Sequence, residues 1–457
     1  MTGSSQFHVS SSESGWSRRT RNTELDTRNP EEGGRALLVA VQVEGAIWDA
    51  ETSLLELADL CRTVGLDPVD QISQRAVHAD PGHYVGKGKL EEVKERAALN
   101  AIDVVVIDDE LSPRIQKNLE DELGRRVIDR TTLILDIFAQ HARTHEGRVQ
   151  VELAQYEFLL PRLVGRGGML SRQGGGIGTR GPGETRLEFD RRSVRQRITT
   201  LKHEIDEIRQ HRGRSRQRRR QQAMPLVALV GYTNVGKSSM LSALTGSQAT
   251  AADAPFVTLD PLTRVMKLAS GQQVLVSDTV GFISKLPATV VAAFRATLEE
   301  LNEADVLIHV VDITDPRAAE CSEVVHQILG EIGLQGKPMI TAINKIDALP
   351  AGMVFGPAPD ADTLVVSART GAGLTALRDR IEAEVNRETP WVAARIPYDR
   401  SDLVDLFHRR GQPVRIEHRA DGTEIEGRLP ARYVERLRPF LLARDPILAG
   451  SRRSASR

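Results

Sequence analysis

The nine residues from Gly231 to Ser239 have the types and spacing needed to bind a phosphorylated ligand. They fit the pattern G-x-x-x-x-G-K-[ST], in which backbone N–H groups converge on phosphates, a lysine reaches the outer phosphates and a hydroxyl holds Mg²⁺. The apolar run before them predicts a buried strand, and the residues after them can continue as a helix. A glycine-rich turn after a core strand is the alternative, which these flanks disfavour. We therefore expect a nucleotide at Gly231, Tyr232, Thr233, Asn234, Val235, Gly236, Lys237, Ser238 and Ser239.

Two later stretches can serve the metal and the terminal phosphate. Thr258 precedes a predicted strand, where its hydroxyl can bind Mg²⁺ and its N–H can bind the γ-phosphate; Thr263 is the alternative threonine. Asp278 follows the next strand and can hold Mg²⁺ through water, while the Gly281 N–H can meet the γ-phosphate. The expected metal ligands are Ser238, Thr258 and Asp278. The groups expected to act on the reacting phosphate are Lys237, Thr258 and Gly281. Further contacts with the nucleotide are expected at Phe256, Val257, Thr279 and Val280.

Two more stretches identify the base. Asp347 lies in Asn344-Lys345-Ile346-Asp347, where its carboxylate can accept hydrogen bonds from the ring N–H and the exocyclic amine of guanine. Adenine lacks that pair of donors and would leave the carboxylate unpaired. The turn Ser367-Ala368-Arg369 follows the last predicted strand and can contact guanine O6. Because all five stretches lie at strand ends in order, at the edge where parallel sheets bind ligands, they indicate a GTPase.

The chain resembles a known family in more than these five stretches. The guanine-binding stretches resemble the TrmE–Era–EngA–YihA branch of translation-factor-related GTPases. The runs Phe256–Pro261, Asp278–Ile283, Gly174–Glu184 and Tyr84–Lys89 resemble the HflX family, although many relatives have Ala at the Val257 position. The resemblance implies a GTP-dependent factor on the large ribosomal subunit that splits stalled ribosomes. It also implies an N-terminal α/β domain, a helical arm that reaches towards the peptidyl-transferase region, and ATP as a candidate ligand of the N-terminal half.

The residue after Gly281 bears on the rate of hydrolysis. Ras-like enzymes have a glutamine there that orients the attacking water, whereas this chain has Phe282, which cannot hydrogen-bond water. We therefore expect slow intrinsic hydrolysis that a partner or a monovalent cation completes. Asn234 resembles an asparagine that binds K⁺ in related GTPases, which makes K⁺ a candidate cofactor beside Mg²⁺ and GTP or GDP.

Apolar residues between the two halves predict an antiparallel helical hairpin. One seam has spacings of four and three from Val149 to Leu163, and a second recurs every seven residues from Leu187 to Ile208. The connector is rich in Gly and Arg, and an arginine-dense run, Arg212–Arg220, follows the second helix. Both features favour contact with RNA, with a disordered spacer and a solvated linker as the alternatives. Glycines and lysines in Tyr84–Lys89 suit a phosphate about as well as they suit a plain loop.

Composition narrows the class of protein. With 40% hydrophobic and 27% charged residues among 457, the chain is expected to be globular. It contains no apolar run long enough to span a membrane, its first residues do not form a signal peptide, and its two cysteines do not make a disulfide scaffold. These features predict a cytoplasmic monomer, with peripheral attachment to a membrane left open.

Together the patterns predict an α/β protein with a P-loop GTPase domain built on a mostly parallel sheet. An N-terminal α/β domain with a long helical hairpin precedes it, and a small α+β domain follows. The expected boundaries are a tail at 1–35, the N-terminal domain at 36–145, the arm at 146–222 with its Gly/Arg-rich loop at 165–184, the GTPase domain at 225–386, the small domain at 391–445 and a tail at 446–457.

Two other functions remain open from the residues alone. The first is a GTPase that acts in assembly of the large subunit. The second is an RNA-remodelling ATPase that works through the N-terminal half, where only the weak glycine and lysine pattern supports a nucleotide site.

Overall fold

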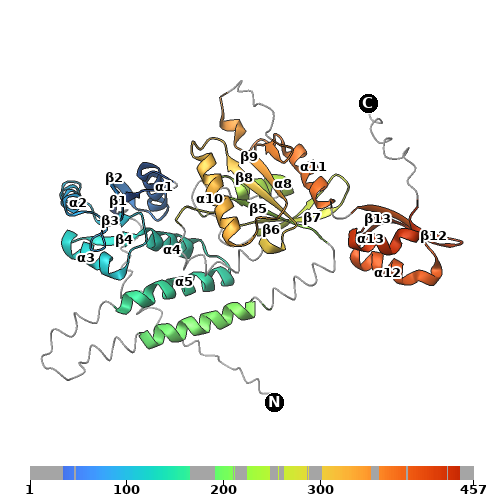
Figure 1. Cartoon of the computed structure of the whole chain (residues 1–457), viewed down its shortest axis with the longest axis horizontal. Helices are drawn as coiled ribbons and strands as arrows, with labels where there is room; N and C mark the ends of the chain where they lie inside the picture. The colour runs from blue at the N-terminus through green and yellow to red at the C-terminus, as the bar shows by residue number, and fades with distance from the viewer. Residues whose placement is uncertain are drawn as a thin grey trace, which may run out of the picture.

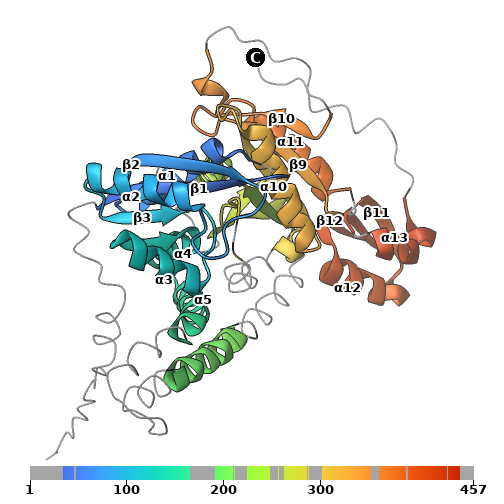
Figure 2. The same cartoon turned by 60° about the vertical axis from the view of Figure 1, so that its left-hand side comes forward.

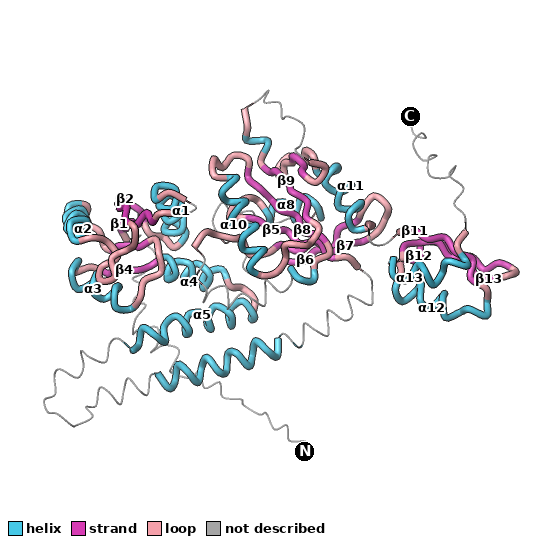
Figure 3. The backbone as a smooth tube through the Cα atoms, in the orientation of Figure 1, coloured by secondary structure: helices cyan, strands magenta, loops and turns pink. Residues whose placement is uncertain are grey.

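The computed structural model describes residues 34–45, 48–164, 191–208, 210, 224–246, 256, 262–285, 287, 301–350, 360–387, 390–429 and 431–442. Three sheets lie in separate parts of the molecule (Figures 1 and 3), and two helices run beneath the first part as an arm. No helix in these ranges is both long and apolar enough to cross a bilayer.

The first sheet is wholly parallel, with the order β2-β1-β3-β4. Strands and helices alternate along this part of the chain, which is why the strands run parallel. A side chain caps α3, since Ser112 accepts a hydrogen bond from the Ile115 N–H and Pro113 is the first helical residue. The elements of this first domain are β1 (Arg35–Val43), α1 (Ala50–Thr63), β2 (Asp67–Ala76), α2 (Lys87–Leu99), β3 (Val104–Ile107), α3 (Pro113–Leu123), β4 (Arg126–Asp129) and α4 (Arg130–His141).

The second sheet has the order β10-β9-β8-β5-β7-β6. Only the pair β6·β7 is antiparallel, so the predicted α/β fold with a mostly parallel sheet is confirmed. The chain places β6 and β7 on one side of β5 and then places β8 on the other side, so the strand order reverses at β5. Sheets of this kind bind ligands at the carboxyl end of the strands where the order reverses. The elements of this nucleotide domain are β5 (Leu226–Gly231), α8 (Lys237–Thr245), β6 (Leu262–Lys267), β7 (Gln273–Asp278), β8 (Val306–Asp312), α10 (Ala318–Glu331), β9 (Met339–Asn344), η2 (Ile346–Ala348), β10 (Thr363–Val365) and α11 (Leu374–Val385).

The predicted helical hairpin is present as α5 (His145–Val164) and a second helix over residues 191–208, which together form the arm. His145 pairs with Glu204 and Glu152 with Arg197, so the two helices are antiparallel. Their apolar seam contains Val149, Leu153, Val194, Ile198, Leu201 and Ile205. The arm also rests on the first domain (Figure 2), where Arg162 donates to the Asp129 carboxylate at 3.0 Å. The Gly/Arg-rich loop at 165–184 and the run Arg212–Arg220 lie outside the described residues.

The third sheet is antiparallel with the order β11-β13-β12, and it has its own apolar core. The turn around Ala420–Thr423 connects two strands. The elements are β11 (Trp391–Ile396), η3 (Tyr398–Arg400), α12 (Ser401–Arg410), β12 (Gln412–Arg419), β13 (Gly422–Arg428), α13 (Ala431–Leu437) and η4 (Arg438–Phe440).

Candidate nucleotide site

The loop between β5 and α8 has the geometry of a phosphate cradle. Gly236 precedes the first helical residue with φ +92°, and a Cβ there would lie 2.5 Å from the Asn344 Nδ2. Gly231 is equally confined, because its Cβ would lie 2.4 Å from the Val310 carbonyl oxygen. Only glycine suits these two positions. The N-terminus of α8 therefore follows the loop directly, where its N–H groups and dipole favour an anion.

Lys237 is buried at the start of α8, and its ammonium group donates to the backbone carbonyls of the loop. The Nζ lies 2.6 Å from the Tyr232 oxygen and 3.2 Å from the Gly231 oxygen. Burial lowers the pKa of Lys237 to about 8, and the nearby Asp278 carboxylate opposes that shift. A desolvated ammonium gains free energy from an anion beside it, which fits a lysine that contacts phosphates.

Ser238 and Asp278 form the pair that fits Mg²⁺. The Ser238 hydroxyl donates to the Asp278 Oδ2 at 2.6 Å, and in the described part of the chain the buried Oδ1 has no hydrogen-bond partner. A hydroxyl and a carboxylate suit Mg²⁺, which usually takes one or two protein carboxylates and completes its shell with phosphates and water. Within the described ranges no cluster of three or more His, Cys, Asp or Glu could hold a metal alone.

Of the two threonines considered for the metal, the structure describes Thr263 but not Thr258. Val257 and Thr258 lie outside the described residues, so their roles stay predictions. Thr263 lies on β6, where its hydroxyl donates to the Ser277 Oγ at 3.2 Å. Thr279 is held by a 2.6 Å hydrogen bond to the Leu229 carbonyl, which fixes the backbone after Asp278.

The segment Val280–Phe282 lies directly on the phosphate loop. The Phe282 N–H donates to the Gly231 oxygen at 3.1 Å, and the Thr233 N–H donates to the Phe282 oxygen at 2.9 Å. A Cβ on Gly281 would lie 2.9 Å from the Thr233 Cα, so glycine is needed at this approach too. The Phe282 side chain is buried and offers no hydrogen-bonding group to a water molecule.

The predicted base-binding residues join two loops at the other end of the site. The Asn344 Nδ2 donates to the Val235 oxygen at 2.9 Å, and its Oδ1 accepts from the Ala368 N–H at 3.0 Å. Lys345 reaches the Asn234 oxygen at 2.9 Å and the Asp312 carboxylate at 2.7 Å. Asn344 and Lys345 thus link the phosphate loop to the end of the sheet where the base is expected.

Asp347 contacts two other residues of the predicted base site, Ser367 and Arg369. Its Oδ1 accepts from the Ser367 hydroxyl at 2.5 Å, and its Oδ2 pairs with Arg369. The hydrogen bond from Ser367 lowers the pKa of the Asp347 carboxyl, which keeps it ionised and able to accept from two donors. The Arg369 side chain is 73% exposed, so this ion pair is weak and easily exchanged for a base.

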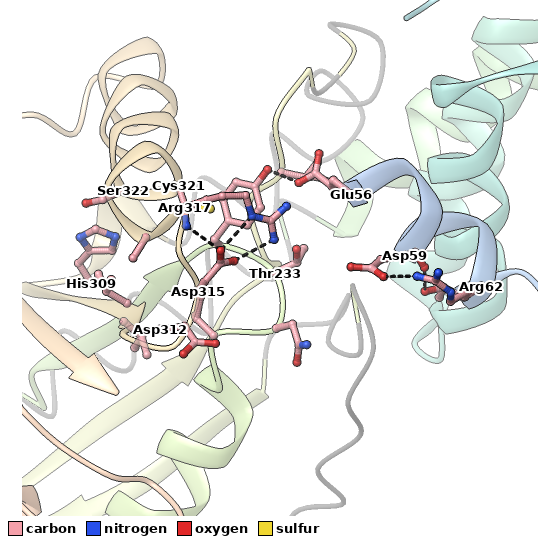
Figure 4. A pocket seen from close by; sticks show the side chains of 18 residues that line it. Glu56, Asp59, Arg62, Thr233, His309, Asp312, Asp315, Arg317, Cys321 and Ser322 are labelled. Carbon is pink, nitrogen blue, oxygen red and sulfur yellow. Dashed lines mark hydrogen bonds and ion pairs between the residues drawn. The ribbon is translucent and has the colours of Figure 1, made fainter. Parts of the chain in front are cut away.

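Tyr232 plays a part that the sequence did not reveal. Its side chain points out of the phosphate loop to the first domain, where its hydroxyl contacts Glu56. A cavity of about 410 Å³ lies beside this contact, and Glu56 and Asp59 of α1 face Asp315 of the nucleotide domain across it (Figure 4). No local pattern marks these residues, because the partners lie far apart in the chain.

The stretch Tyr84–Lys89 forms a loop and the start of α2. The Tyr84 hydroxyl donates to Asp109, the Gly86 N–H donates to the Gln74 side chain at 3.0 Å, and Lys89 pairs with Glu92 at 2.7 Å. ATP binding in this half of the chain stays a prediction.

Three family models match successive parts of the chain. Residues 51–139 match the "GTP-binding GTPase N-terminal" region, residues 141–219 the "GTP-binding GTPase Middle Region", and residues 226–345 the "50S ribosome-binding GTPase" model.

Curated relatives match over almost the full length. The GTPase HflX of Caldanaerobacter subterraneus subsp. tengcongensis is 44% identical over 409 residues, which cover 90% of this chain and 94% of the relative. The GTPase HflX of Lacrimispora saccharolytica is 44% identical over 397 residues, covering 87% and 94%. The GTPase HflX of Escherichia coli K12 is 42% identical over 368 residues, covering 78% and 84%. With this identity over this length, and with the phosphate loop and the base-binding residues at one sheet edge, the chain belongs to the HflX family of GTPases.

Proposed function

We propose that this GTPase hydrolyses GTP to GDP and phosphate at the β5–α8 loop, and that its GTP-bound form associates with the large ribosomal subunit and splits or rescues stalled ribosomes. The observation that carries the chemistry is the link through Asn344, which joins the phosphate loop at Val235 to the base loop at Ala368. The ribosomal role is supported by the description of the family model that matches residues 226–345.

Each group has a separate role in this proposal. The Asp347 carboxylate reads guanine, Lys237 contacts the outer phosphates, and the N–H groups at the start of α8 surround them. Ser238 and Asp278 hold Mg²⁺, with Thr258 as a third ligand. The bound ion would neutralise negative charge on the phosphates. Gly281 donates its N–H to the γ-phosphate.

Intrinsic hydrolysis should be slow. The position that orients water in Ras-like enzymes is the buried Phe282, whose backbone is paired with the phosphate loop. A ribosomal group or a K⁺ ion must therefore complete the site. The expected result is that large subunits raise GTP turnover, and that K⁺ supports more turnover than Na⁺. Fast turnover by the isolated chain in Na⁺ would contradict this part of the proposal.

The nucleotide also sets the affinity for the ribosome. GTP orders the loops that carry Thr258 and Gly281, and hydrolysis releases them, as in other γ-phosphate switches. More of the chain should pellet with large subunits in a non-hydrolysable GTP analogue than in GDP. Equal pelleting in the two states would rule out such a switch.

The decisive experiment is light scattering of intact ribosomes mixed with the chain. Scattering should fall on addition of GTP and remain unchanged with GDP, because only the GTP form splits the particle. The Asp347→Asn variant provides a control in the same mixture, since it should respond to xanthosine triphosphate instead of GTP. If the chain bound only precursor particles and left intact ribosomes unchanged, assembly of the large subunit would replace splitting as the function.

A further inference from the structure

The third sheet has one open edge, which is formed by β12. This strand pairs with β13 on one side, and no other strand of the described residues lies on its second side. The opposite edge is covered, because Leu441 bridges Ala394 of β11 and the Leu442 N–H donates to the Ala393 oxygen at 2.8 Å. The sheet lies at the end of the molecule away from the first domain (Figures 1 and 2). An open edge of this kind is a template for pairing with another strand.

The turn between β12 and β13 determines which backbone groups face this edge. A loop of two residues joins the paired residues Arg419 and Gly422. In such a hairpin the residues that flank the turn bond to each other, and the bonding then alternates along the strand. The N–H and C=O groups of His418 and Ile416 therefore point away from β13. They are directed to the open edge, where a second strand would meet them.

Apolar side chains lie along the same edge. Ile416 is directly opposite Ile425, which is fully buried in the core of this domain, so both side chains are on the core face of the sheet. Ile416 itself is 38% exposed, and Val414, which lies at a bulge in the pairing, is 69% exposed. An apolar side chain from a second strand would therefore continue the core across the edge.

The other face of β12 carries charges that alternate in sign. The Arg415 Nε donates to the Glu417 carboxylate at 2.8 Å, and Arg419 donates to the same carboxylate at 2.5 Å. All three side chains remain accessible, with exposed fractions of 58% for Arg415, 33% for Glu417 and 51% for Arg419. Charges on an edge strand usually prevent pairing. These charges have opposite signs, so they prevent it only in some registers.

A second copy of β12 is complementary to the first in one antiparallel register. A two-fold axis at Ile416 places this side chain opposite its own copy. It also places Arg415 of each copy opposite Glu417 of the other, and Val414 opposite His418. Two pairs of opposite charge then lie on one face and two β-branched side chains meet on the other, an arrangement that stabilises neighbouring strands. The interface is isologous, as in most two-fold dimers.

The neighbouring registers are less favourable. An axis at Arg415 or at Glu417 would bring two like charges face to face, which destabilises a strand pair. An axis at His418 would oppose the strand to the turn residues Ala420 and Asp421, which are not extended. Pairing also ends at the bulge, next to Pro413, which has no N–H to donate. The edge therefore specifies one short pairing.

We propose that two copies of this chain associate through β12, in an antiparallel pairing centred on Ile416 that joins their third sheets into one. The surface is separate from the nucleotide site, so the proposal does not depend on the proposed function. Short strand segments bury less area than a standard interface, so we expect a weak dimer with a dissociation constant of about 10–100 µM. Below that range the chain is the monomer expected from the sequence.

Sedimentation equilibrium of the full-length chain from about 1 µM to about 300 µM measures this association. The average mass should rise from that of one chain towards that of two. The dissociation constant should be the same in GDP and in a non-hydrolysable GTP analogue, because β12 lies in a different sheet from the nucleotide site. Glu417→Arg should weaken association by about tenfold or more, because the new arginine of each copy would face Arg415 of the other. Arg415→Glu should weaken it as much.

Two combinations should restore the complementary charges. The double variant Arg415→Glu/Glu417→Arg exchanges the two signs and should associate within about threefold of the wild type. An equal mixture of the two single variants should form a mixed dimer, although neither variant associates alone. A variant that failed to fold could not recover in this mixture. Recovery therefore separates a lost charge pair from a lost structure.

Glu435→Arg is the matched control. Glu435 makes an exposed ion pair with Arg438 at 3.3 Å, and its helix α13 packs against β11 on the other side of the sheet. This variant should associate as the wild type does. The proposal would be overturned by a wild type that stays monomeric at about 300 µM or by a dimer that depends on the nucleotide. It would equally be overturned by unchanged association of Glu417→Arg, by a mixture that does not recover, or by an equal loss in Glu435→Arg.

Discussion

The Asp347→Asn substitution tests the base site with a change of one atom. Ser367 donates to the Asp347 Oδ1 at 2.5 Å, so the variant amide should turn its oxygen to Ser367. Its NH₂ then takes the position of Oδ2, where the wild type presents an acceptor. At this position an N–H donor of guanine would face the NH₂ donor of the new amide. Xanthine has a carbonyl in place of the exocyclic amine and would meet the amide with complementary groups.

The size of the effect follows from the one hydrogen bond that guanine would lose at the Oδ2 position. Such a bond to a charged acceptor contributes about 1.5–3 kcal/mol. This corresponds to about tenfold to a hundredfold weaker binding of GDP. Arg369 loses its charged partner as well, but its exposed ion pair adds little to that figure.

Calorimetric titration of the full chain with GDP and with xanthosine diphosphate measures both affinities. The variant should prefer the xanthine nucleotide, and the wild type should prefer GDP. Asp362→Asn is the matched control, because Asp362 pairs with Arg380 and does not contact the base-binding residues. If Asp347→Asn bound GDP as tightly as this control, the assignment of Asp347 as the base-reading residue would be refuted.

Three further substitutions test other parts of the structure. Gly236→Ala should weaken GTP binding about tenfold or more in titrations, because its Cβ would lie 2.5 Å from Asn344, whereas Gly246→Ala, with positive φ but open space, should bind normally. Burial lowers the pKa of His309 to about 4, so the unfolded chain binds a proton there more readily than the folded chain. The free energy of unfolding should therefore decrease as the pH falls from about 6.5 towards 4, by about 2 kcal/mol at pH 5. Melting curves of His309→Gln should show a smaller decrease over the same pH range. Leu201→Ala in the arm should cost about 2–5 kcal/mol in denaturant unfolding, because that side chain is fully buried.

Local patterns were sufficient to predict the loop glycines and the arm. Gly231 and Gly236 follow from a nine-residue motif, and the structure shows the backbone approaches that require them. Seven-residue spacing gave the seam of the arm, which packs through Leu201 and its neighbours. Such features depend on residues close in sequence, so one sequence contains the information.

The contacts between domains could not be predicted in this way. Arg130 meets Glu56 across 74 positions and Ser284 across 154. Each of these residues is polar, and from the sequence alone each would be expected to lie on the surface. Their burial follows from the packing of α1 and α4 against the nucleotide domain, which shares one apolar cluster with the first domain. Only the assembled fold shows that Tyr232 belongs to the domain interface as well as to the phosphate loop.

Two consecutive residues connect the arm with the nucleotide loops. Asp129 accepts from Arg162 of the arm at 3.0 Å, and its other oxygen caps α4 by accepting the Thr132 N–H at 2.9 Å. The next residue, Arg130, donates to the Ser284 hydroxyl beside the phosphate loop. Because both side chains leave the same helix start, a displacement of Arg162 that keeps its hydrogen bond to Asp129 would strain the cap of α4 or move Arg130. The arm is thereby connected through α4 to the segment that follows Gly281.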